Sequence, residues 1–259
     1  MEQLKITLFQ AYLFWENTEK NLQNISLKLT NNLREKTDLI VLPEMFNTGF
    51  TMNAAAHAEK MDGKTISWML DTAKKYNAVI TGSLIIEEDG KFYNRLIWAR
   101  PDGSYEYYDK KHLFGMGGED KVYTAGNQQL IVELHGWKIM PVICYDLRFP
   151  VWLRNYGARY DLLLVIASWP ESRAHHWRTL LPARAVENQS FVVALNRVGY
   201  DGREVYYSGD STCLNPQGNV VYYKRDEEDF YTFTINKQDI EQTRRLMPFL
   251  KDADNFDLL

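Results

Sequence analysis

Residues 137–150 read WKIMPVICYDLRFP, an apolar run that leads directly into Cys144 and is followed closely by Pro150. A short apolar run bounded by a proline predicts a buried strand, because proline cannot continue a hydrogen-bonded ladder. Cys144 then lies at the carboxyl end of this strand, just before Pro150 turns the chain into a short helix. In open α/β folds this edge of the sheet is where ligands bind.

The segments on either side of this stretch alternate between strand and helix patterns. The segment LIVEL at 130–134 is separated from 137–143 only by His135 and Gly136, so the two are predicted to pair across a turn. Apolar residues at helical spacing predict helices at about 16–34 and 65–77. Helices are also predicted near 174–188 and in the tail after 236, which then becomes loose. Further strands are predicted at 4–8 with one buried face, and at 38–44, 78–86, 92–99, 161–168 and 191–196, with a hairpin around NPQG at 215–218.

Strands that alternate with helices, mixed with hairpins, predict an α/β fold in which helices cover the sheets. No linker, repeat or low-complexity stretch interrupts the pattern, so residues 1–259 are expected to form a single domain.

The composition excludes several classes of function. A net charge of -4 provides no basic field for nucleic acid, and no apolar run approaches the roughly 20 residues of a membrane span. The N-terminal residues MEQLKITLFQ do not resemble a secretory signal, and two cysteines suit a reducing compartment, so a cytoplasmic enzyme is expected. Neither G-x-G-x-x-G nor a P-loop occurs, and the pair His175 and His176 is too isolated for zinc, so no cofactor or metal is expected.

Three residues, Cys144, Glu44 and Lys110, indicate a catalytic site only when they are considered together. Taken singly, Cys144 reads as a buried structural cysteine, Glu44 as a solvated residue at the end of the strand DLIVLPE, and Lys110 as part of a solvated face. Glu44 and Cys144, however, each follow an apolar strand, so a carboxylate and a thiol could meet at one sheet edge. Lys110 lies in YDKKHLF, whose apolar flanks are expected to lower the pKa of its ammonium. Cys213, in STCLN without charged neighbours, reads as structural.

The motifs LPEMFNTGF, YDKKHLF and CYDLRFP resemble, in order and spacing, the glutamate, lysine and cysteine motifs of the nitrilase superfamily. The similarity covers nearly the whole chain, including YN at 93–94, RAVENQ at 184–189 and GDS at 209–211. It implies a four-layer α-β-β-α sandwich, commonly paired into a homodimer. It selects Lys110 over Lys111 and places a second acidic residue at Glu119, with Asp120 as the competing position.

The resemblance is strongest to the omega-amidase branch, which deamidates 2-oxoglutaramate and 2-oxosuccinamate. It implies that Cys144 is the nucleophile, Glu44 the general base and Glu119 a positioning residue. The oxyanion would be stabilised by Lys110 and the backbone N–H of Tyr145. A free thiol has a pKa of about 8.5, so attack at neutral pH requires such a base or a positive neighbour.

A small amide with a terminal carboxylate also requires a cation in the substrate pocket. Arg173, in SWPESR after the strand 161–168, is the first candidate, with a surface arginine as the competing reading. Arg148 is the second candidate, although it could instead hold Asp146. Phe114 is assigned to the same pocket.

Three alternatives stay open at this stage. A related hydrolase of carbamoyl amides, short amides or nitriles would use the same four residues. A scaffold of the same fold would lack catalysis, although intact Glu44, Lys110 and Cys144 argue against it. A papain-like enzyme would pair Cys144 with His175 or His176, but the papain signature is missing.

Overall fold

The computed structural model describes residues 2–254, and its centre consists of two β-sheets that pack face to face. The first sheet has the strand order β13-β1-β2-β3-β4-β5, and the second has the order β10-β11-β9-β8-β7-β6, with β12 paired to β11. The first sheet contains β1 (Gln3–Gln10), β2 (Leu39–Val41), β3 (Val79–Glu88), β4 (Lys91–Ala99), β5 (Tyr105–Asp109) and β13 (Asp229–Asn236). The second contains β6 (Val132–Leu134), β7 (Trp137–Ile143), β8 (Leu162–Ala167), β9 (Phe191–Asn196), β10 (Val198–Tyr200), β11 (Tyr206–Leu214) and β12 (Val220–Arg225).

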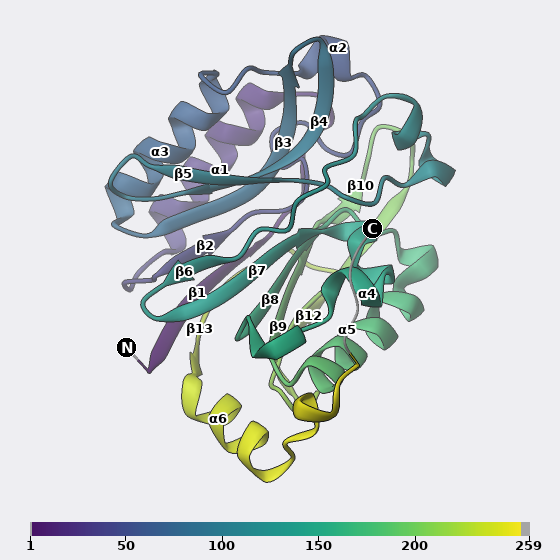
Figure 1. Cartoon of the computed structure of the whole chain (residues 1–259). Coiled ribbons are helices and arrows are strands. Elements are labelled where there is room, and N and C mark those ends of the chain that lie inside the picture. Colours follow the sequence, from purple (N-terminus) through teal and green to yellow (C-terminus); the bar gives the residue numbers. More distant parts are fainter. Residues whose placement is uncertain (1, 255–259) are drawn as a thin grey trace.

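Helices cover the outer face of each sheet, as Figure 1 shows. Helices α1 (Thr18–Asn32) and α3 (Lys64–Tyr76) lie over the first sheet, while α4 (Pro150–Leu153) and α5 (Ala174–Asn188) lie over the second. Two further helices are α2 (Ala54–His57) and α6 (Lys237–Leu246). The resulting order of layers is helix, sheet, sheet, helix, which confirms the predicted α-β-β-α sandwich.

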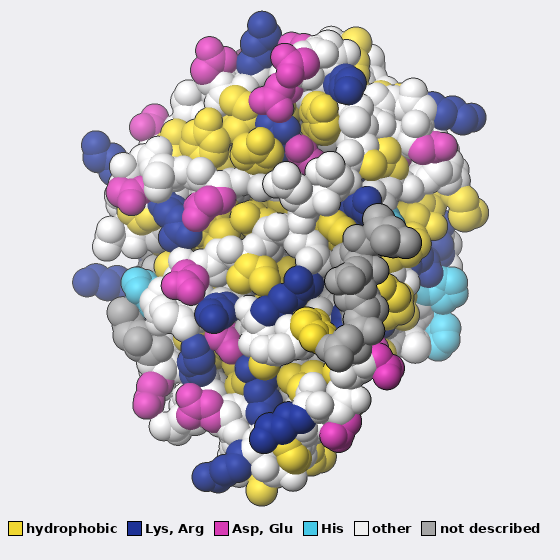
Figure 2. Space-filling model, viewed as in Figure 1, with side chains coloured by type: hydrophobic (Ala, Val, Ile, Leu, Met, Phe, Trp, Pro, Cys, Tyr) yellow, Lys and Arg dark blue, Asp and Glu magenta, His cyan; other side chains and the backbone are white. Residues whose placement is uncertain are grey.

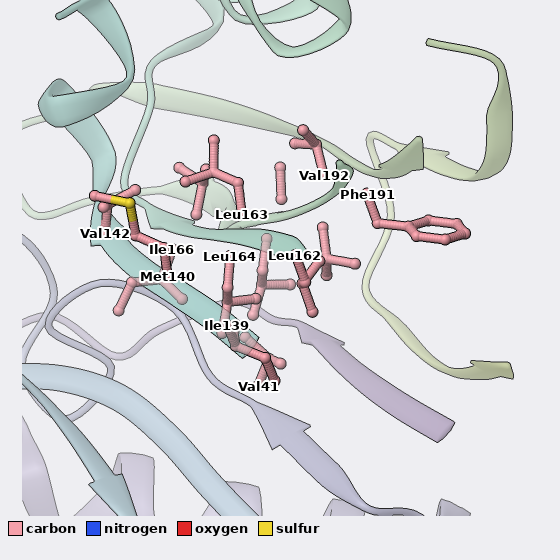
Figure 3. Close-up of a cluster of buried hydrophobic side chains, with 14 of the residues drawn as sticks. Val41, Ile139, Met140, Val142, Leu162, Leu163, Leu164, Ile166, Phe191 and Val192 are labelled. Atoms are coloured by element: carbon pink, nitrogen blue, oxygen red, sulfur yellow. The ribbon is translucent and has the colours of Figure 1, made fainter. Parts of the chain in front are cut away.

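The main core lies between the two sheets. In Figure 3, Val41 of β2 lies beside Ile139 of β7, and both side chains are fully buried in one cluster. The neighbouring strands β8 and β9 add Leu162, Leu164 and Val192 to this cluster. Each such side chain contributes about 1.5–3 kcal/mol when it is removed from water, so the inner faces hold the sheets together.

Most predicted elements are confirmed, and their ends differ by a few residues. Helix α5 has the predicted bounds, and the pair β6–β7 turns at His135 and Gly136, which both have positive φ as a tight hairpin turn requires. The hairpin around NPQG joins β11 to β12. Within residues 237–254 the tail forms α6 and a short 3₁₀ helix, Phe249–Asp252, and its last part, 255–259, lies outside the described residues.

One prediction about burial was wrong. Strand β1 was expected to bury one face, but Thr7 on its other face is also fully buried. The Thr7 hydroxyl hydrogen-bonds to Thr37 and Thr232, which satisfies its polar atom inside the protein. The alternation of polar and apolar residues therefore predicted the strand correctly, but its polar face is not fully exposed to solvent.

Charged side chains of both signs are interspersed on the face shown in Figure 2. Among residues 2–254, no helix is long and apolar enough to cross a membrane.

Candidate active site

The predicted site residues come from both sheets. Strands β7, β8 and β9 are parallel neighbours, and Cys144, Ser168 and Asn196 stand at or just beyond their carboxyl ends. Glu44 follows β2 of the opposite sheet, three residues after the strand ends at Val41. The expectation that Glu44 and Cys144 share one sheet edge was therefore wrong, because the two residues meet across the sandwich.

Backbone hydrogen bonds hold Glu44 against the second sheet. The N–H of Ser168 donates to Glu44 Oε2 at 2.7 Å, and the Ser168 hydroxyl donates to the Glu44 carbonyl at 3.3 Å. Cys144 Sγ lies 3.9 Å from the carbonyl oxygen of Ser168. Ser168 thus contacts both the carboxylate and the thiol.

Cys144 lies on a sharp turn between β7 and the 3₁₀ turn Cys144–Arg148. Its φ of 47° is in the left-handed region, which non-glycine residues rarely adopt and which costs about 1–3 kcal/mol. Buried Asp146 stabilises the turn, because its Oδ2 accepts hydrogen bonds from the Ile143 N–H at 3.0 Å and from the Tyr108 hydroxyl at 2.8 Å. This turn aims the thiol at the cavity described below.

Asp146 also connects this turn to the loop that follows Lys110. Its Oδ1 accepts a hydrogen bond from the N–H of His112 at 2.9 Å and lies 2.8 Å from Nδ1 of the same residue. The His112 ring stacks on Phe149 with ring centres 3.7 Å apart. The lysine and cysteine motifs are therefore joined through one buried carboxylate.

Lys110, Glu44 and Glu119 form a buried ionic cluster. Lys110 Nζ donates to Glu44 Oε1 at 2.8 Å and to Glu119 Oε1 and Oε2 at 3.0 and 2.8 Å, and all three side chains are fully buried. The amide of Asn94 bridges the two carboxylates, donating to Glu44 Oε1 at 2.8 Å and to Glu119 Oε1 at 3.1 Å. Asp120, the competing acidic position, is exposed.

The cluster changes the protonation of its members. Burial by itself lowers the pKa of Lys110, but Glu119 and Glu44 outweigh it and hold the ammonium pKa above its ordinary value. The prediction that Lys110 has a lowered pKa was therefore wrong, since the sequence did not show both carboxylates beside it. Burial and the charge of Glu44 raise the pKa of Glu119 against the opposing effect of Lys110.

The thiol is held in its protonated form. Burial raises the pKa of Cys144 well above its ordinary value, and the charge of Glu44 adds to this shift while Lys110 opposes it. A thiol in this environment needs a base to become a nucleophile, and Glu44 is the carboxylate that acts on it most strongly. The arrangement can therefore support base-assisted attack by sulfur with a cation beside the reacting atoms.

A cavity of about 340 Å³ opens beside Cys144 and Lys110. Aromatic rings form much of its wall, and three arginines are present: the lining includes Phe50, Phe114, Tyr145, Trp169, Tyr207, Arg148, Arg173 and Arg203. The predicted pocket residues Arg173, Arg148 and Phe114 are thus all placed in this cavity. A volume of this size matches a small organic substrate.

Arg148 and Arg173 pack against aromatic rings. The Arg173 guanidinium lies 5.0 Å from the Phe114 ring centre, and that of Arg148 lies 4.6 Å from the Trp169 ring centre. Burial, together with the neighbouring charge of Arg173, lowers the pKa of Arg148. Within residues 2–254 neither arginine forms an ion pair with a carboxylate. The alternative in which Arg148 holds Asp146 is wrong, because Asp146 is occupied by Tyr108, His112 and Ile143.

The remaining candidates lie away from the cluster. His175 and His176 are exposed at the start of α5, where His176 contacts Arg148, and no described histidine is hydrogen-bonded to Cys144. Cys213 is buried in β11, and burial raises its pKa. Across the described part of the chain, no group of three or more His, Cys, Asp or Glu could hold a metal ion.

Sequence reasoning assigned no role to Asn94, Ser168 or Arg203. Asn94 belongs to the pair YN that contributes to the family resemblance, and this was its only signal. Ser168 contacts Glu44 Oε2 and Cys144 through its backbone, and backbone contacts carry no sequence signal. Arg203 reaches the cavity from the loop after β10, and it belongs to none of the motifs that carry the resemblance.

Known proteins resemble this chain over its full length. Residues 5–245 match the carbon-nitrogen hydrolase family. The chain is 42% identical over 263 residues to the omega-amidase YafV of Escherichia coli strain K12, with 100% of both chains covered. It is 34% identical over 219 residues to a 2-oxoglutaramate amidase of Bacillus subtilis, with 83% of this chain and 84% of that protein covered.

Solved structures show the same fold. A carbon-nitrogen hydrolase superfamily protein from Xanthomonas campestris, whose active site carries an arsenic adduct, has a TM-score of 0.97 at 42% identity, with 100% of both chains covered. An amidase from Nesterenkonia sp. has a TM-score of 0.83 at 23% identity, with 95% of both chains covered. The second likeness concerns the fold alone.

Proposed function

The chain belongs to the carbon-nitrogen hydrolase family of the nitrilase superfamily, and we propose that it is an omega-amidase that hydrolyses 2-oxoglutaramate and 2-oxosuccinamate. Such an enzyme releases the 2-oxo acid and ammonia from a short amide with a terminal carboxylate. The observation that carries this proposal is the pair Arg148 and Arg173, two guanidinium groups without a carboxylate partner in residues 2–254, in the cavity that contains Cys144.

In the proposed mechanism Cys144 is the nucleophile and Glu44 the general base. Glu44 takes the Sγ proton as sulfur attacks the amide carbon, forming a carbon–sulfur bond. The protonated Glu44 then gives this proton to the amide nitrogen, so that ammonia leaves when the carbon–nitrogen bond breaks. The raised pKa of the Cys144 thiol, caused mainly by burial, supports a step that begins with proton removal.

Lys110 and the backbone N–H of Tyr145 would stabilise the oxyanion that attack creates. Two of the Lys110 hydrogen bonds go to the two oxygens of one carboxylate, Glu119, so one donor can turn to the oxyanion while the other holds Glu119. One such donor is worth roughly 3–4 kcal/mol in the transition state.

The resulting thioester on Cys144 is hydrolysed in the second half of the reaction. Glu44 removes a proton from water, and the resulting hydroxide attacks the thioester carbon. The carbon–sulfur bond then breaks, Glu44 returns its proton to sulfur to regenerate the Cys144 thiol, and the acid product releases its proton to solvent as the carboxylate. Glu119 is proposed to be a positioning residue, because its carboxylate accepts hydrogen bonds from Lys110, Asn94 and the Phe114 N–H.

The substrate carboxylate is proposed to pair with Arg173 and Arg148, with Phe114 packing beside Arg173. The test compares kcat/KM for 2-oxoglutaramate with that for an uncharged amide of similar length, in wild type and Arg173→Ala. From the change in kcat/KM, the variant should lose about 2–5 kcal/mol of transition-state stabilisation for the acidic substrate and little for the neutral one. Equal losses would mean that Arg173 supports the fold, and a wild type that prefers the neutral amide would contradict the omega-amidase proposal.

A relative that acts on carbamoyl amides, other short amides or nitriles would use the same cluster. A panel of these compounds assayed for ammonia release separates the candidates. A non-catalytic scaffold would release no ammonia from any of them, and its Cys144 would react with iodoacetamide as slowly as Cys213.

We further propose a single domain over residues 1–259, a homodimer and a cytoplasmic location. An apolar surface over α5 and β12 supports the dimer, since Val186, Val220 and Tyr223 are 45%, 63% and 43% exposed. Sedimentation should give twice the chain mass, whereas a monomer at micromolar concentration would contradict it. Two free cysteines suit a reducing compartment, which cell fractionation tests.

A further inference from the structure

The loop 201–205, between β10 and β11, forms one wall of the cavity. Arg203 and Val205 of this loop line the cavity together with Tyr207, the second residue of β11. Arg203 is the exposed one among the three cavity arginines, whereas Arg148 and Arg173 are half-buried. The loop therefore places a solvated cation where the cavity meets solvent.

The shape of the loop is fixed by a buried carboxylate. Asp201 Oδ1 accepts hydrogen bonds from the N–H groups of Arg203 at 2.8 Å and Val205 at 3.0 Å, and its Oδ2 accepts one from the Tyr207 hydroxyl at 3.0 Å. Gly202 packs so closely on Trp15 that a Cβ there would lie 2.3 Å from the indole ring. Because the backbone is held at both points, the position of Arg203 is set by the fold.

The Arg203 side chain has few interactions to satisfy its charge. It donates a weak hydrogen bond to the Phe50 carbonyl at 3.4 Å and lies 5.7 Å from the Trp15 ring centre. No carboxylate in residues 2–254 forms an ion pair with it. The Phe50 ring lies 5.2 Å from Lys110 Nζ, so Phe50 stands between Arg203 and the buried cluster.

A second cation lies behind the same wall. Arg197 is fully buried, its guanidinium is 4.7 Å from the Tyr207 ring centre, and its Nε and Nη1 have no hydrogen-bond partner among the described residues. The Lys110 cluster carries at most one net negative charge, from two carboxylates and one ammonium. Asp201 adds at most one more negative charge, so the three positive charges of the cavity arginines exceed the negative charges, and the mouth of the cavity attracts anions.

We propose that Arg203 is a specificity-determining residue that attracts the substrate carboxylate to the mouth of the cavity, from which it passes to Arg148 and Arg173. This inference rests on the proposed omega-amidase function and adds a residue to it. Because Arg203 is exposed, its attraction acts through solvent and is screened over a Debye length of about 10 Å at 0.1 M salt. The effect of Arg203 should therefore depend on ionic strength, and it should change kcat/KM more than kcat.

The experiment measures kcat and kcat/KM for 2-oxoglutaramate and for an uncharged amide of similar length. Wild type, Arg203→Gln, Arg203→Lys and Arg245→Gln are compared at low and high sodium chloride. Arg245 is exposed on α6, outside the residues that line the cavity, so Arg245→Gln makes the same charge change as a matched control.

Arg203→Gln should lower kcat/KM for the acidic amide about three- to tenfold at low salt, with a smaller deficit at high salt. Arg203→Lys should recover most of the loss, because the charge is restored without the guanidinium geometry. The neutral amide should change less than about twofold, and Arg245→Gln should match wild type on both substrates.

The role of Arg203 would be overturned by equal losses on both amides, by a loss that is independent of salt, or by no rescue with lysine. Failure of the proposed function itself looks different, because wild type would then show no preference for the acidic amide. A wild type that prefers the acidic amide, together with an unaffected Arg203→Gln, would reject the Arg203 inference alone.

Discussion

Replacing Lys110 with methionine tests the buried cluster at its centre. Methionine keeps most of the apolar volume but removes an ammonium that donates at 2.8 Å to Glu44 and at 2.8 and 3.0 Å to Glu119. Since both carboxylates are fully buried, the variant leaves two negative charges close together without a counter-charge. Removing one partner of a buried ion pair costs about 3–5 kcal/mol, and we expect a loss of unfolding free energy in this range near neutral pH.

The loss should depend on pH in a defined direction. Burial and the charge of Glu44 already raise the pKa of Glu119, and the variant removes Lys110, which opposes this shift. A carboxyl with a raised folded pKa favours the folded state at low pH, and this contribution is lost as pH rises through the folded pKa. Urea unfolding should therefore show a larger deficit for Lys110→Met at about pH 7.5 than at about pH 5.

Activity gives the second measurement on the same variant. Loss of an oxyanion donor should lower kcat by about 10²–10³. Lys111→Met is the matched control, because Lys111 is half-buried and its ammonium lies 5.3 Å from the Trp152 ring centre. This substitution should lower the unfolding free energy by about 1 kcal/mol or less and leave kcat near that of wild type. The reasoning is refuted if Lys110→Met keeps kcat within tenfold of wild type, if its stability deficit is the same at both pH values, or if Lys111→Met is the more damaging change.

Three other substitutions test neighbouring parts of the site. Because burial raises the pKa of Glu119, the stability that its protonated form contributes is lost as pH rises. The unfolding free energy of Glu119→Gln, measured in urea relative to wild type, should therefore increase between about pH 5 and pH 7.5. A relative decrease over this range would show that Glu119 is stabilised in its charged form. Asp146→Asn should lose about 1–3 kcal/mol of unfolding free energy, because an amide nitrogen would face a donor from His112 or Tyr108, and unchanged stability would contradict this role. Cys213→Ser should keep kcat, with iodoacetamide inactivating it as fast as wild type; slower inactivation would indicate that Cys213 takes part in the site.

Much of the fold followed from local patterns. The apolar run 137–143 became β7 with the predicted bounds, and 174–188 became α5. The layer order came from the family resemblance, since periodicity alone does not determine how two sheets stack.

The site was predicted in its residues but not in its electrostatics. Glu44, Lys110 and Cys144 were identified from their motifs, whereas the raised pKa of Lys110 required knowledge that two carboxylates lie within hydrogen-bond distance. Glu44 follows β2 and Lys110 follows β5, which are separated by β3 and β4 in the first sheet, so no local pattern shows that these side chains meet. Arg203 was missed because its loop reaches the cavity through a long-range contact with Trp15.

The central claim is that hydrolysis proceeds through a thioester on Cys144. Intact mass spectrometry during turnover of 2-oxoglutaramate should show an acyl adduct whose added mass equals that of the substrate minus ammonia. Digestion should map this adduct to Cys144. Cys144→Ala should form no adduct and release no ammonia. Full activity in Cys144→Ala, or an adduct that maps to Cys213, would contradict the account.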